Sequence, residues 1–113
     1  MNDNFSKIEI IDESRGIAAL QAPMNLLGGE SNFELSKLID NLDNQSIKIF
    51  TLDLSKVVAI NSSGLGSIIA ANRILTSKKI KFILIQPSNK VLEILSITHL
   101  DKVFNIANDY SAL

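Results

Sequence analysis

The segment Asn61–Gly66, which reads Asn-Ser-Ser-Gly-Leu-Gly, holds the residue types with the clearest chemical potential in the chain. The hydroxyls of Ser62 and Ser63 stand where an apolar strand pattern has ended and a helical pattern begins, so Ser62 is expected to cap the helix. Gly64 and Gly66 each cost about 1 kcal/mol of helix propensity relative to alanine. Their lack of bulk indicates that another backbone, a partner or a phosphate comes close here.

A phosphate on Ser62 would meet the free N–H groups and the positive dipole end of the helix, which suit an added charge of about −1.5 to −2. The fold should survive this change, whereas the outer surface would turn from small and neutral to bulky and anionic. The segment therefore predicts a switch that displaces a docked partner without internal rearrangement. The simpler interpretation of Ser62 is a helix cap and nothing more.

The elements that must position these serines follow from the hydrophobic patterns. Alternating strands and helices predict an α/β domain with right-handed parallel crossovers, preceded by an antiparallel hairpin. The fold class is thus a mixed β-sheet, an N-terminal hairpin plus parallel strands, covered by helices. We expect strands over 7–11, 16–21, 47–54, 80–85 and 103–106, a loop over 25–31, and helices that begin at Ser31 or Asn32, at Asn61–Ser62 and at Pro87–Ser88, the second ending with Lys78–Lys79 in its last turn.

Apolar spacing predicts which face of each helix is buried. The strands over 47–54 and 80–85 are continuously apolar, which is typical of strands covered on both faces. The expected buried helix positions are Leu35, Leu38, Ile39 and Leu42 in the first helix, Leu65, Ile68, Ile69 and Ile74 or Leu75 in the second, and Val91, Leu92, Ile94 and Leu95 in the third.

The length and composition exclude several classes of protein. The 113 residues fit a single domain spanning 1–113, and the absence of cysteine removes disulfides, thiolate metal sites and thiol nucleophiles. A net charge of −1 lacks the positive field that nucleic-acid binding needs. The polar start Met1–Phe5 does not resemble a signal peptide, and no apolar run approaches the roughly 20 residues of a membrane span. We expect a soluble cytoplasmic protein without membrane insertion.

The run Leu-Asp-Leu-Ser-x-Val over 52–57, followed by Ser-Ser-Gly-Leu-Gly over 62–66, resembles the signature of STAS domains, specifically bacterial anti-sigma factor antagonists. The resemblance implies a non-enzymatic phosphoprotein that acts in sigma factor regulation of transcription. Its unphosphorylated form would capture an anti-sigma factor serine kinase, and a phosphatase would reset it. It implies Ser62 as phosphoacceptor, with Ser63 the second choice, no cofactor, and a monomer or weak dimer. The implied partner-binding residues are Asn25, Asn61, Ser62, Ser63, Gly64, Leu65 and Gly66.

Two positions depart from that family pattern. Asn61 stands where an aspartate usually precedes the acceptor, and Ala22-Pro23-Met24-Asn25 replaces a loop that usually ends in aspartate. Either the phosphorylation site persists with altered kinase recognition, or the chain binds without being phosphorylated. The second case corresponds to an accessory STAS subunit of a transporter or of a signalling scaffold.

Other candidate residues point less clearly to chemistry. Gly28-Gly29-Glu30-Ser31 before a helix permits an anion cradle but lacks the lysine of a phosphate loop, so it is interpreted as a flexible loop. His99 is interpreted as a helix-end surface residue, and Asp53 ends a strand where it could face the serines. No catalytic or metal set is expected. An enzyme or nucleotide-binding domain with a flavodoxin-like or receiver-like fold is the remaining alternative, but a receiver needs an acidic cluster and an acceptor aspartate.

Overall fold

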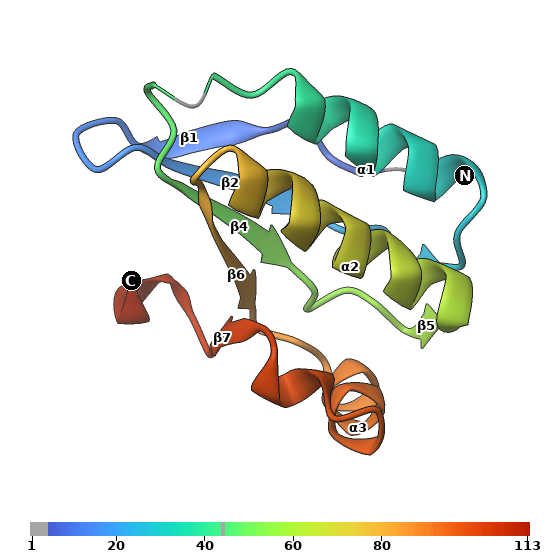
Figure 1. Cartoon of the computed structure of the whole chain (residues 1–113). Coiled ribbons are helices and arrows are strands. Elements are labelled where there is room, and N and C mark those ends of the chain that lie inside the picture. Colours follow the sequence, from blue (N-terminus) through green and yellow to red (C-terminus); the bar gives the residue numbers. More distant parts are fainter. Residues whose placement is uncertain (1–4, 44) are drawn as a thin grey trace.

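In the computed structural model, which describes residues 5–43 and 45–113, a five-stranded mixed sheet forms the centre of the protein (Figure 1). The strand order is β1-β2-β4-β6-β7; β1 runs antiparallel to β2 and the remaining neighbours are parallel. The predicted antiparallel hairpin followed by parallel strands is thus confirmed. The bounds are β1 Glu9–Asp12, β2 Ile17–Gln21, β4 Ile49–Asp53, β6 Lys81–Ile85 and β7 Asn105–Ala107.

The central strands β4 and β6 are covered on both faces, as their continuous apolar runs predict. Phe50 and Phe82 pack into the main core with their ring centroids 6.0 Å apart. Thr51 and Ile85, on the opposite face, are also fully buried, and the Thr51 hydroxyl donates to the Ala18 carbonyl oxygen at 3.0 Å. This hydrogen bond satisfies a polar group that would otherwise destabilise the interior.

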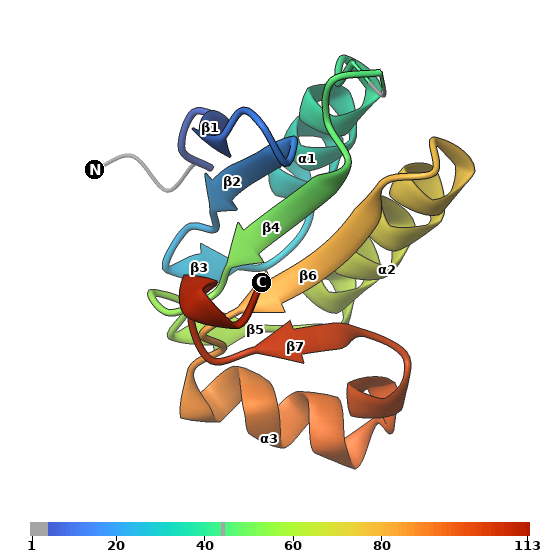
Figure 2. The same cartoon turned by 90° about the vertical axis from the view of Figure 1, so that its left-hand side faces the viewer.

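Two helices, α1 (Glu30–Asp40) and α2 (Ser62–Ser77), pack side by side over one face of the sheet (Figures 1 and 2). Ile68 and Leu75 of α2 are fully buried, but Ile69 is 38% exposed, so its predicted burial is wrong. The buried stripe also includes the small residues Gly64 and Ala71. At 100° per residue these two rotate the centre of the stripe away from Ile69.

The helix ends differ by a residue or two from expectation. The first helix begins at Glu30, after Gly29, rather than beyond a cap at Ser31 or Asn32. The second ends at Ser77, so the prediction that Lys78 and Lys79 lie in its last turn is wrong. Instead, Lys78 Nζ donates to the carbonyl oxygens of Asp40, at 3.1 Å, and Leu42 near the end of α1, which ties the two helix ends together. Asn44 and residues 1–4, including most of the predicted polar start, lie outside the described residues.

The third helix, α3 (Asn89–Ile97), lies beside β7 at the edge of the sheet (Figure 2). Its predicted start is confirmed, since the Ser88 hydroxyl caps it by accepting from the Val91 N–H at 3.4 Å. Val91 and Leu95 are buried, but Leu92 is 41% exposed, so its predicted burial is wrong. Leu92 faces away because a helix at the edge of a sheet buries only a narrow side.

A second, small sheet was not predicted. It pairs β3 (Asn25–Leu26) with β5 (Ala59–Ile60) in parallel. The expectation of a loop over 25–31 is therefore wrong at its first two residues, and also at its last two, which belong to α1. Strands of two residues are too short to show a period of two. Their pairing brings the segment after β2 alongside the residues that lead into α2. Among the described residues, no helix is long and apolar enough to cross a membrane.

The neighbours Ile68 and Ile69 offer a test of the buried face of α2. We expect Ile68→Ala to lower the free energy of unfolding by about 2–5 kcal/mol, because it removes fully buried methyl groups and leaves a cavity. The matched variant Ile69→Ala should cost less than about 1 kcal/mol. Urea denaturation followed by circular dichroism measures both, and equal losses would contradict this assignment of the face.

Candidate functional site

Asn61, and not Ser62, caps α2. The Asn61 backbone is extended (φ −119°, ψ −177°), and its Oδ1 atom accepts from the Gly64 N–H at 2.8 Å. Its carbonyl oxygen accepts from the Leu65 N–H at 2.9 Å. The expectation that Ser62 is the cap is therefore wrong, because the asparagine side chain reaches the first-turn N–H group that a serine cap would use. Ser62 becomes the first residue of the helix, and its exposed hydroxyl is not needed to start it.

The Asn61 cap leaves part of the start of α2 without a compensating acceptor among the described residues. Within residues 5–43 and 45–113, the N–H groups of Ser62 and Ser63 have no hydrogen-bond acceptor, and the first turn contains no acidic residue. A helix start carries a partial positive charge from such N–H groups. An anion attached to the Ser62 hydroxyl would therefore meet a favourable local field.

Gly64 brings the first turn of α2 directly onto the backbone of β3. A Cβ atom at position 64 would lie 1.8 Å from the Leu26 carbonyl oxygen and 2.6 Å from its carbon. The close approach expected at Gly64 is thus real, and the approaching group is the chain's own backbone. Around Gly66, by contrast, a Cβ atom would meet nothing within 4 Å. The two glycines of the motif therefore have different surroundings.

Ser63 makes a second close contact with the same segment. Gly28 has a positive φ of 87°, and a Cβ atom there would lie 2.1 Å from Ser63 Oγ and 2.5 Å from Ser63 Cβ. The Ser63 side chain therefore occupies the space that a side chain at position 28 would need. Leu26 and Gly28 are both packed on α2. Ser62 and Ser63 are both exposed, but only Ser63 also lies against the backbone at Gly28.

The structure brings most of the predicted site residues together. Asn25 is half-buried in β3, paired with Ala59 two residues before Asn61. Gly64 and Leu65 are buried, so they support the surface from beneath. The exposed members of the predicted set are Asn61, Ser62, Ser63 and Gly66.

Sequence reasoning missed three exposed apolar residues near this site. Met24 and Val58 are 49% and 58% exposed, and the Val58 N–H donates to the Met24 carbonyl oxygen at 2.8 Å. Leu27, between Leu26 and Gly28, is 49% exposed. Apolar residues flanking a small strand look like core positions in a sequence, so only their measured exposure identifies them as surface.

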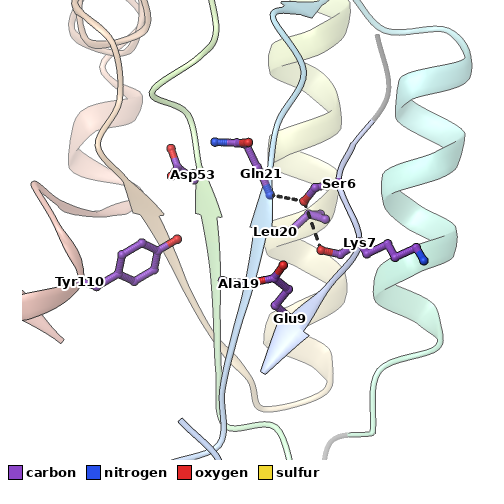
Figure 3. A pocket seen from close by; sticks show the side chains of 8 residues that line it. All are labelled: Ser6, Lys7, Glu9, Ala19, Leu20, Gln21, Asp53 and Tyr110. Atoms are coloured by element: carbon purple, nitrogen blue, oxygen red, sulfur yellow. Dashed lines mark hydrogen bonds between the residues drawn. The ribbon is translucent and has the colours of Figure 1, made fainter. Parts of the chain in front are cut away.

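Asp53 does not lie with Ser62 and Ser63 at the start of α2. It lines a shallow hollow of about 220 Å³ on the sheet face that α1 and α2 leave uncovered, together with Gln21, Glu9 and Tyr110 (Figure 3). Burial raises the pKa of the Tyr110 phenol, and the charges of Asp53 and Glu9 raise it further, against a hydrogen bond with Thr51. The C-terminal 3-10 turn Tyr110–Ala112 thus partly covers that face.

His99 lies at a helix end, as predicted. It follows α3, is exposed and adopts a left-handed backbone with φ of 62°. In the described part of the chain, no three histidine or acidic side chains gather where a metal ion could bind.

Comparison with known proteins places this geometry in a family. The model of the STAS domain matches residues 10–112. The chain belongs to the STAS domain family. The β4–β5–α2 unit carries residues 52–66, which resemble the STAS signature, and Ser62 and Ser63 lie exposed at the start of its helix.

Solved STAS structures share the architecture. A candidate anti-sigma factor antagonist from Thermotoga maritima, TM1081, is 29% identical, with a TM-score of 0.75 over 93% of this chain and 87% of that one. A STAS domain anti-sigma factor antagonist from Planctomyces limnophilus is 18% identical, with a TM-score of 0.70 over 93% of each chain. The antagonist SpoIIAA in its unphosphorylated form is 14% identical, with a TM-score of 0.64 over 96% of this chain and 91% of that one. The last two likenesses establish the fold alone.

Gly64 and Gly66 make a matched pair for testing the packing of the motif. We expect Gly64→Ala to destabilise the protein by about 1–3 kcal/mol, because its methyl group overlaps the Leu26 carbonyl. Gly66→Ala should stabilise by up to about 1 kcal/mol through helix propensity, since its surroundings are open. Thermal and urea unfolding measure both changes, and a stabilising Gly64→Ala would disprove the close contact.

Asn61 offers a test of the cap. Removing the Oδ1 acceptor in Asn61→Ala should lower the free energy of unfolding by about 1 kcal/mol. Asn61→Asp keeps the acceptor and adds a negative charge at the helix start, so it should equal or exceed the wild type by about 0.3–1 kcal/mol at neutral pH. If Asn61→Ala were neutral while Ser62→Ala cost about 1 kcal/mol, Ser62 would be the cap instead.

Proposed function

We propose that this STAS domain is an anti-sigma factor antagonist whose binding to an anti-sigma factor kinase is controlled by phosphorylation of Ser62. The observation that carries the proposal is the exposed Ser62 hydroxyl at the only partly compensated start of the 16-residue helix α2. The family membership and the likeness to antagonists support the general kind of function. In this proposal the chain acts in the cytoplasm, and a phosphatase restores the unphosphorylated form.

Phosphate at Ser62 would be tolerated by the fold. In the described part of the chain, the N–H groups of Ser62 and Ser63 are free to donate to phosphate oxygens, and the Ser62 hydroxyl makes no hydrogen bond that a phosphate would break. Ser63 is our second choice as acceptor, because its side chain already lies against the backbone at Gly28. The geometry therefore favours Ser62 over its neighbour.

Partner binding would be lost because of what the phosphate adds to the surface. Met24, Leu27 and Val58 are exposed apolar side chains near this site. Val58 lies three residues before Asn61, its N–H donates to the Met24 carbonyl oxygen, and Leu27 is next to Gly28, which faces Ser63. A partner that buries such a surface would have to desolvate a charge of about −1.5 to −2. Phosphorylation would then release the partner without changing the fold.

A second function remains open because Asn25 and Asn61 are neutral where the family pattern is usually acidic. Asn61 already uses its side-chain oxygen as the helix cap. A STAS domain that serves as an accessory subunit of a transporter or scaffold would use the same surface without phosphorylation. Its binding would be insensitive to a negative charge at position 62.

Phosphorylation of matched serine variants tests the proposal. Incubation with the cognate anti-sigma factor kinase and ATP should add one phosphate to the wild type and to Ser63→Ala, and none to Ser62→Ala, as read by intact mass. Ser62→Asp should weaken binding to that kinase by more than about tenfold in calorimetry. No phosphate on the wild type, together with equal binding of Ser62→Asp, would instead support the accessory-subunit function.

A further inference from the structure

Leu27 is an exposed apolar residue whose two neighbours are both held against α2. On one side, the Leu26 carbonyl touches Gly64; on the other, Gly28 touches the Ser63 side chain. Leu27 itself remains 49% exposed. A leucine at a loop tip ordinarily moves with its loop, but here the flanking backbone is packed on a helix at two points.

Each of the two contacts depends on a glycine, one on the helix and one on the loop. Gly64 belongs to the helix and receives the loop backbone, whereas Gly28 belongs to the loop and receives a helix side chain. Side chains at either position would separate the two elements. Leu26 adds a third anchor, since it is fully buried in the core and paired with Ile60 of β5. The backbone on both sides of Leu27 is therefore positioned before any partner arrives.

We propose that Leu27 is an anchor residue for the protein partner that docks at Ser62, and that Ser63 is the positioning residue that holds it in place. The proposal rests on the proposed function and specifies the partner's side of the contact: an apolar pocket next to the surface that faces the Ser62 hydroxyl. Apolar anchors dominate binding when they enter a pocket, and pre-organisation lowers the entropy lost on binding. In this proposal Ser63 contributes to partner binding by contacting Gly28, and not by receiving a phosphate.

The binding test compares two exposed leucines. Leu27→Ala should weaken binding to the recombinant cognate anti-sigma factor kinase by at least about tenfold, whereas Leu92→Ala, on α3, should leave it within about twofold. Both leucines are substantially exposed, so neither variant should unfold the protein, which circular dichroism checks. Equal affinities for the two variants, with Ser62→Asp still losing binding, would overturn the anchor and leave the proposed function standing. If Ser62→Asp and Leu27→Ala both bound like the wild type, the anchor role of Leu27 and the proposed function would both be wrong.

The positioning role of Ser63 has a test that needs no partner. Ser63→Gly and Ser62→Gly place glycine in the same helical turn, but only the first removes the atoms that face Gly28. We expect ¹⁵N order parameters of Leu27 and Gly28 to fall from about 0.85 toward about 0.6 in Ser63→Gly and to stay unchanged in Ser62→Gly. Ser63→Gly should also bind more weakly than Ser62→Gly. Order parameters that do not distinguish the two variants would overturn the positioning role.

Discussion

The contact between Gly64 and the Leu26 carbonyl is the constraint on which the exposed part of this STAS domain depends. With no side chain at position 64, the first turn of α2 rests directly on β3, and Leu26 pairs with Ile60 just before the helix begins. The helix start, the small sheet and the segment after β3 are thereby joined. The direction in which Ser62 points follows from this packing, because the opposite side of the same turn is buried.

Ser62 was expected both to cap α2 and to present its hydroxyl to a partner, but three residues at the helix start have separate roles. Asn61 supplies the capping oxygen, Ser63 packs against Gly28, and Ser62 is left with an exposed hydroxyl. Because Asn61 is the cap, the capping hydrogen bond of α2 does not involve Ser62. The phosphorylation that we propose at Ser62 would therefore change the surface and leave the fold as it is.

The neutrality of the site also has a physical consequence. The first turn of α2 contains no acidic residue, and Asn25 and Asn61 are amides. A phosphate on Ser62 would bring to this turn a negative charge that it does not otherwise carry. It would face the N–H groups of Ser62 and Ser63, which have no acceptor among the described residues, at the positive end of the helix dipole. The carboxylates of Asp53 and Glu9 do not offset this, because they gather with Tyr110 on the sheet face away from α1 and α2 (Figure 3).

The sequence by itself determined the mixed sheet, the helix that starts at Ser62 and the STAS resemblance, because long apolar periods and the Ser-Ser-Gly-Leu-Gly run are local signals. It misjudged Ile69 and Leu92, since apolar spacing defines a face only to within the width of a residue. Tertiary structure alone decided that Asn61 is the cap, that Gly64 meets the chain's own backbone and that Gly28 meets Ser63. The two glycine contacts join residues more than thirty positions apart through β3 and β5, strands of two residues each that show no period. The Asn61 cap spans only three residues, but Asn61 and Ser62 are both good capping residues, so only the folded chain shows which one caps α2. The family resemblance already ranked Ser62 above Ser63, and only the folded chain shows that Ser63, although exposed like Ser62, also lies against Gly28.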